Sequence, residues 1–214
     1  MKKRFALALL VLLAACSSEP RPEPIKLDYS QLGKIYLNTQ DLRIINRAQN
    51  VPQWTPYVGH LFQPTLVEAI YRYAGDRLQA AGQLGHATLI IKDANITEQS
   101  LATSSDFESL FRRQQGSKYI GRVEVSLEAQ SPYDGSIGAA TAYAVYTASL
   151  PEEPTEYEKY EAYRKVLNSM MSDLNKGLER SIHDHMPRFV LSGPATDAAQ
   201  TAPQIMPPVL GVKK

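Results

Sequence analysis

The alternation of apolar and polar residues is clearest in the middle of the chain, where it predicts paired strands. Residues 123–129 read VEVSLEA, so apolar side chains would face one side of a sheet and polar ones the other. A second apolar stretch follows at residues 137–150. Between them, Pro132 presets a turn-like φ and Gly135 can supply a positive φ. The pattern therefore predicts an antiparallel hairpin.

Apolar residues spaced three and four apart predict two amphipathic helices. Pro64 suits a first helical turn, and the apolar spacing that follows it continues until Gly82. Near the other end, Thr155 and Glu158 have the spacing of a capping box, and the apolar stripe behind them continues to Pro187. This second helix would contain about 30 residues and be about 45 Å long.

The remaining elements complete an α+β arrangement. Residues 34–38 and 42–45 predict one broken strand or a hairpin, and residues 87–91 (ATLII) predict a central strand that Ala94 and Ile96 extend. A short helix is expected at residues 104–115. The resulting order, β-α-β-β-β-α, predicts a two-layer fold with a mostly antiparallel sheet of about four strands and two amphipathic helices on one face.

The first residues have the features of a secretion signal. Three basic residues (2–4) precede an uncharged run at residues 5–14, which is shorter than the roughly 20 residues of a membrane-spanning helix. Residues 13–16 (LAAC) resemble the lipobox of bacterial lipoproteins, in which a peptidase cuts before an acylated cysteine. We therefore expect residues 1–15 to be removed and Cys16 to carry palmitate and related acyl chains. The alternative is an ordinary signal peptide followed by a cysteine of no special role.

Composition sets the domain limits and excludes one class of partner. We expect an acylated, Pro-rich tether at residues 16–30, one domain at residues 31–191 and a disordered tail at residues 192–214. The chain has 23 Lys and Arg and 22 Asp and Glu, and loss of the three basic signal residues leaves 20 − 22 = −2. This charge argues against nucleic acid as a partner.

The sequence contains no motif that predicts catalysis. It lacks a G-x-S-x-G elbow, a P-loop and an H-E-x-x-H pair, so no enzyme activity and no cofactor are expected. His183 and His185 flank Asp184, but side chains two apart on a helix point about 200° away from each other. Histidines near a helix C-terminus also interact favourably with the helix dipole, so no metal site is predicted there.

One irregular segment is a candidate contact surface. Residues 51–62 contain the only tryptophan, Trp54, together with Tyr57 and Phe62. Large aromatic side chains in a loop often anchor an interface, so we predict that these three bind a partner. The alternative is that they cap the core.

These features together resemble a known group of envelope proteins. A lipobox, a Pro-rich tether and an aromatic loop before the first helix (Trp54, Thr55, Pro56, Tyr57, with Leu66 beyond) resemble the PqiC-type auxiliary lipoproteins of ABC-type, MCE-associated transport systems. The resemblance implies a non-enzymatic accessory or scaffold protein of a lipid transport system, with envelope transport proteins as its partners. It also implies attachment to the periplasmic face of the bacterial outer membrane. Ser17 agrees, because an Asp after the cysteine would resemble an inner-membrane retention signal.

A second interpretation has a comparable element order. An LptE-like or pilot lipoprotein, which supports assembly of an outer-membrane translocon or secretion machine, would also combine a lipid anchor with a small α+β domain. Both interpretations remain open from the sequence. A third interpretation, an envelope hydrolase, is disfavoured because the sequence has no recognisable pair of nucleophile and base.

Overall fold

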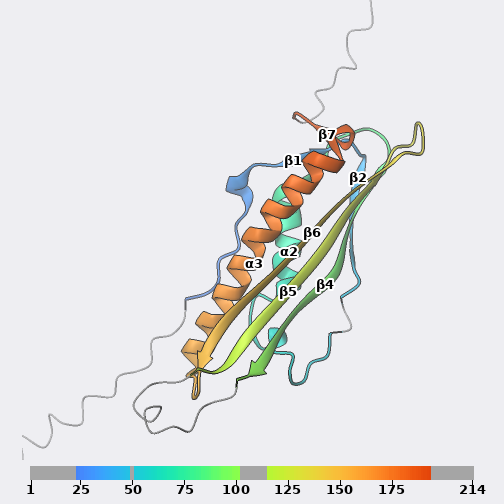
Figure 1. Cartoon of the computed structure of the whole chain (residues 1–214). Helices are drawn as coiled ribbons and strands as arrows, with labels where there is room; N and C mark the ends of the chain where they lie inside the picture. Colours follow the sequence, from blue (N-terminus) through green and yellow to red (C-terminus); the bar gives the residue numbers. More distant parts are fainter. Residues whose placement is uncertain (1–22, 49–50, 102–114, 194–214) are drawn as a thin grey trace, which may run out of the picture.

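The computed structural model describes residues 23–48, 51–101 and 115–193 (Figure 1). This part of the chain has two α-helices, a four-stranded sheet and a three-stranded sheet, which confirms the predicted α+β class. The predicted signal peptide, Cys16, the predicted tail beyond residue 193 and most of the helix predicted at residues 104–115 lie outside the described residues. Gln115, the last residue of that predicted helix, begins a strand instead.

The larger sheet has the order β2-β4-β5-β6, and its last three strands follow one another in the chain. β2 pairs with β4 in parallel, whereas the β4–β5 and β5–β6 pairs are antiparallel. The sheet is therefore mostly antiparallel, as predicted. Its strands are β2 (Asp41–Asn46), β4 (His86–Ser100), β5 (Gln115–Gln130) and β6 (Ile137–Pro151).

The turn between β5 and β6 confirms the predicted hairpin. Gly135 has a φ of 69°, a backbone angle that residues other than glycine rarely adopt. The hydroxyl and backbone N–H of Ser136 donate to the Asp134 carboxylate at 2.7 and 3.1 Å. These hydrogen bonds lower the pKa of Asp134 to about 2. Local hydrogen bonding thus fixes the turn, and with it the register of the two long strands.

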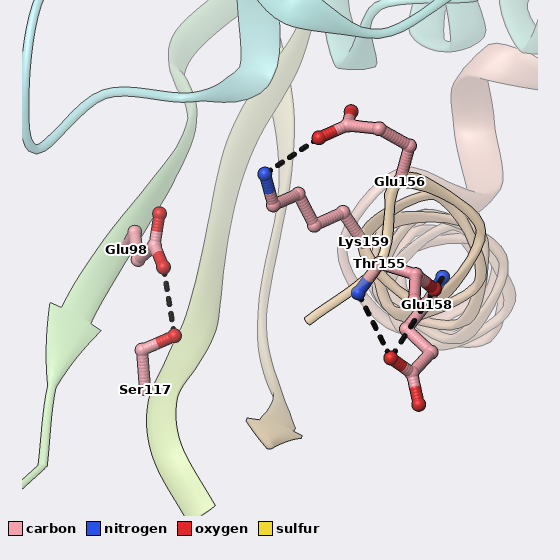
Figure 2. Close-up of polar contacts among 6 residues, drawn as sticks. All are labelled: Glu98, Ser117, Thr155, Glu156, Glu158 and Lys159. Atoms are coloured by element: carbon pink, nitrogen blue, oxygen red, sulfur yellow. Dashed lines mark hydrogen bonds and ion pairs between the residues drawn. The ribbon is translucent and has the colours of Figure 1, made fainter. Parts of the chain in front are cut away.

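Two helices, α2 (Leu66–Arg77) and α3 (Glu156–His185), cover one face of this sheet (Figure 1). Figure 2 shows the predicted capping box at the start of α3, where the Thr155 N–H donates to Glu158 Oε2 at 2.9 Å. The Glu158 N–H in turn donates to Thr155 Oγ1 at 3.2 Å. Thr65 and Glu68 form the same box at the start of α2. α3 has 30 residues, as the apolar stripe predicted.

Small side chains on the sheet let α3 pack closely against it. Every buried position of β6 except Leu150 is an alanine or a glycine, and large side chains of α3 fill the space above them. On β5, a Cβ placed on Gly121 would lie only 2.6 Å from Val166 Cγ1 of α3. The buried small residues of β6 are Gly138, Ala140, Ala142, Ala144 and Ala148, and the large buried side chains of α3 include Leu167, Met170, Leu174 and Leu178.

A second sheet was not predicted. Its order is β3-β1-β7, formed by β1 (Ile35–Leu37), β3 (Leu78–Ala80) and β7 (Val190–Leu191). The prediction of one broken strand or a hairpin at residues 34–45 is wrong, because β1 and β2 belong to different sheets. The extension of the first helix to Gly82 is also wrong. Its last residues leave the helix after Arg77 because they pair in parallel with β1 as β3.

The close contact between α3 and the sheet can be tested at Gly121. We expect Gly121→Ala to lower the free energy of unfolding by about 1–3 kcal/mol, because the added methyl group displaces the Val166 and Met170 side chains. Gly75→Ala in α2 is the control, since its added Cβ would meet nothing within 4 Å beyond its chain neighbours and the backbone of its own helix. It should raise stability by up to about 1 kcal/mol through helix propensity. Chemical denaturation measures both, and an unchanged Gly121→Ala protein would contradict this packing.

Candidate partner-binding surface

The long helix gives the domain two distinct ends (Figure 1). We call the end where α3 begins the Trp54 end. The loop at residues 51–62, which carries Trp54, lies there, because its Phe62 stacks on Tyr163 in the first part of α3. We call the opposite end the hairpin end, because Tyr133 of the β5–β6 turn lies there beside Phe189, which follows α3.

The loop at residues 51–62 is held along the second half of β4. The Val58 N–H donates to the Ile96 carbonyl at 2.9 Å, and the Glu98 N–H donates to the Pro56 carbonyl at 2.7 Å. The Val58 side chain is buried. The loop is therefore anchored by the sheet on one side and can present side chains from a fixed backbone on the other.

The structure separates the three aromatic residues that the sequence grouped together. Trp54 is 70% exposed, whereas Tyr57 is half-buried and forms a β-bridge with Thr97. Phe62 packs inward, stacked on Tyr163 with ring centroids 4.4 Å apart. Leu61, which is 66% exposed, was not among the residues predicted from the sequence. Trp54 and Leu61 are thus the large apolar side chains that this segment offers to a partner.

An aromatic cluster fixes the end of the loop against α3. Phe62 meets Tyr119 edge-on at 6.0 Å, and the Tyr163 hydroxyl donates to the Pro64 carbonyl at 2.6 Å. Burial raises the pKa of both tyrosine hydroxyls above the usual value. The loop therefore depends on the core at its base while Trp54 remains accessible.

A hollow of about 280 Å³ adjoins the loop. Its lining includes Tyr57, His60, Thr65 and Asn95. The Asn95 side-chain oxygen is buried and has no hydrogen-bond partner within the described part of the chain. These side chains suit a polar group that accepts or donates hydrogen bonds.

A larger hollow of about 490 Å³ lies at the hairpin end. Leu84, Tyr133, Asp134 and Arg188 are among its lining residues. Tyr133 is 83% exposed. This end therefore also offers an aromatic side chain to solvent, on a turn that local hydrogen bonds hold in place.

The two histidines near the end of α3 have separate partners. His183 Nδ1 lies 3.2 Å from the Asp184 carboxylate, and His185 Nδ1 lies 3.0 Å from the Ser181 carbonyl. Over residues 23–48, 51–101 and 115–193, no three His, Cys, Asp or Glu side chains are placed to hold a metal ion. Nor does any helix in these ranges have the length and apolar character needed to span a membrane.

Residues 23–33, which we call the N-terminal strap, lie against the two helices (Figure 1). Ile25, Leu27 and Tyr29 are half-buried against the core, whereas Lys26 and Asp28 between them are exposed. Most of this segment was predicted to belong to the tether at residues 16–30. Its alternating pattern, IKLDY, was the available signal that it packs on a surface.

Hydrogen bonds hold the strap at both helices. The Tyr160 hydroxyl of α3 donates to the Glu23 carbonyl and accepts from the Ile25 N–H, each at 3.0 Å. Further along, the Tyr29 N–H donates to the Asp76 carboxylate of α2 at 3.1 Å. The segment thus begins its contacts near the start of α3.

The buried guanidinium of Arg77 secures the other end of the strap. Its Nη1 donates to the carbonyls of Leu32, at 2.6 Å, and of Gly33. Its Nη2 donates to the Glu179 carboxylate at 3.0 Å, and its Nε donates to the Asn175 side chain at 3.2 Å. One side chain therefore joins the strap, α2 and α3.

Comparisons with known proteins give only distant similarities. No family model matches the chain, and no curated protein matches it. Rare lipoprotein B from Shewanella oneidensis superposes with a TM-score of 0.36 and 9% identity, over 68% of this chain and 96% of that one. A DUF330 protein from Xanthomonas campestris superposes with a TM-score of 0.32 and 13% identity, over 77% of this chain and 92% of that one. At these TM-scores neither similarity assigns a fold or a function.

The different placement of Phe62 and Trp54 predicts different effects of substitution. We expect Phe62→Ala to lower the free energy of unfolding by about 2–3 kcal/mol, because it removes the ring that packs on Tyr163 and Tyr119. Trp54→Ala should change it by less than about 0.5 kcal/mol, because the side chain is mostly in solvent. Denaturant titration of both variants measures this, and equal losses would contradict the arrangement.

Proposed function

We propose that this chain is a lipid-anchored lipoprotein of the bacterial envelope that acts as a non-enzymatic accessory component of a transport assembly. The observation that carries the proposal is the lipobox at residues 13–16, with the only cysteine of the chain at its end. Several acyl chains on Cys16 would hold the protein to a leaflet without a spanning helix, because each buried CH₂ contributes about 0.8 kcal/mol. The folded domain would then work at a membrane surface.

The resemblance to PqiC-type lipoproteins supports a more specific form of the proposal. In this form the protein lies at the periplasmic face of the outer membrane and serves an ABC-type, MCE-associated lipid transport system. The exposed side chains of Trp54 and Leu61, on a loop that β4 and α3 hold in place, supply the surface for such a partner. Tryptophan is enriched among the residues that contribute most to protein interfaces.

Acylation of Cys16 is the first requirement of this proposal. We expect labelled palmitate to enter the protein in cells, and Cys16→Ser to abolish both the label and membrane residence, because the thiol is the attachment atom. Ser17→Ala is the matched control and should keep both. Membrane fractionation and fluorography measure the outcome, and an unlabelled wild-type protein would refute the anchorage.

The contact surface is tested by the partner that co-purifies with the acylated protein. We expect Trp54→Ala to reduce recovery of that partner by about tenfold or more, as when a central aromatic contact of an interface is truncated. Tyr133→Ala, which removes an exposed aromatic side chain at the hairpin end, should leave recovery unchanged. Undiminished recovery with Trp54→Ala would contradict the assignment.

Mass spectrometry of the same sample separates the two interpretations of the sequence. An MCE-type protein would support the transport role. A β-barrel or a secretin would instead support an LptE-like or pilot lipoprotein.

A further inference from the structure

We propose that the N-terminal strap decides which end of the domain is held at the membrane, and that the docked strap holds the Trp54 end there. This inference rests on the proposed lipid anchorage at Cys16. It adds the direction in which the domain faces, which neither the anchor nor the fold determines alone.

The attachment point follows from where the strap first contacts the domain. The first hydrogen bonds are those between the Tyr160 hydroxyl and the backbone at Glu23 and Ile25. Tyr160 lies in the first turns of α3, on the same stretch as Tyr163, which contacts Phe62. Glu23 comes seven residues after Cys16 (23 − 16 = 7), and seven residues reach at most about 25 Å. With the strap docked, the Trp54 end therefore stays within about 25 Å of the bilayer.

An undocked strap would tether the domain from its other end. From Glu23 the strap runs beside the helices toward β1, which lies at the hairpin end (Figure 1). Lys34, which follows the strap, lines a hollow with His183 and Pro187 at the end of α3. Without docking, the leash would run from Cys16 to Lys34, which is 18 residues (34 − 16 = 18) or at most about 65 Å. Docking thus shortens the leash by more than half and moves the attachment point along most of α3.

Contacts with the domain are spread along the strap. Ile25 and Leu27 pack on the core, and the Tyr29 ring meets the Tyr73 ring edge-on at 5.5 Å. Asp76 binds the middle of the strap, and the buried guanidinium of Arg77 binds its end. Apolar burial and hydrogen bonds therefore act along its whole length.

The proposed contact residues lie at the end that the docked strap brings toward the bilayer, where Trp54 is 70% exposed and Leu61 is 66% exposed. Charge does not supply the orientation, since Glu152, Glu153 and Glu156 are exposed near the start of α3. The covalent leash and the docked strap are the orienting elements.

One cysteine and one tryptophan make the orientation measurable. The purified protein from Cys16 onward is coupled through its thiol to maleimide lipids, in vesicles that also carry dansyl-labelled headgroups, and energy transfer from Trp54 is recorded. The comparison protein carries Trp54→Phe and Tyr133→Trp, which places the only tryptophan at the hairpin end. We expect transfer from Trp54 to be higher by about threefold or more, because most of the roughly 45 Å length of α3 separates the two positions. Equal or reversed transfer would overturn the proposal.

The role of the strap is tested in the same vesicles. Ile25→Ser with Leu27→Ser removes two inward side chains of the strap and should abolish or reverse the difference in transfer. Pro24→Ser with Lys26→Ser changes exposed neighbours and should preserve it. Circular dichroism confirms that each variant is folded. A difference that survives in a folded Ile25→Ser, Leu27→Ser protein would show that the strap does not set the orientation.

Chemical coupling keeps this test separate from the proposed function. The geometry is measured whether or not cells acylate Cys16. Failure of palmitate labelling would therefore refute the anchorage, whereas failure of the transfer difference would refute the orientation.

Discussion

The arrangement of the helix layer depends on the hydrogen bonds of one buried group, the guanidinium of Arg77. A charged group that is 1% exposed is stable only if hydrogen-bonding partners replace the water it has lost. Arg77 takes those partners from three places: the end of the strap, the side chain of Asn175 and the carboxylate of Glu179. Moving any one of them away would leave buried polar groups with fewer partners. The strap, α2 and α3 are therefore held as one layer.

The sheet beneath this layer is shaped by small residues. Alanine and glycine at the buried positions of β6 allow α3 to lie close to the strand along much of its length. The large side chains that fill the core then come mainly from the helix and from β4 and β5. The result is an elongated body whose two ends differ in chemistry. The Trp54 end has an aromatic loop anchored to β4, and the hairpin end has a turn fixed by Asp134.

The parts of the fold that could be predicted are those with strong local signals. The turn around Gly135 and the capping box of Thr155 and Glu158 each depend on residues within a few positions of one another, so the sequence determined them directly. The second sheet could not be predicted in this way. β1, β3 and β7 have two or three residues each, and their partners lie far apart in the chain. Pairing with β1 also ends the first helix at Arg77, although the apolar spacing predicted that the helix would continue to Gly82.

The candidate site shows the same division. Sequence composition identified the segment that carries Trp54, but it could not tell which aromatic ring points outward. That choice depends on Tyr163 and Tyr119, which are distant in the chain and meet Phe62 only in the folded protein. Residues 23–30 of the strap were predicted to be part of the tether, although their alternating pattern is that of a packing surface. Their position against Tyr160 and Asp76 required the structure.

The direction of the strap also determines how the domain would bear mechanical load. The strap enters at Glu23 beside Tyr160 and runs along the helices until Arg77 holds its far end. If the proposed anchor holds the domain at a bilayer and a partner pulls the domain away, the force would be directed along the strap. The contacts of the strap would then be sheared together and share the tension, whereas a strap that left the domain sideways would lose its contacts one at a time.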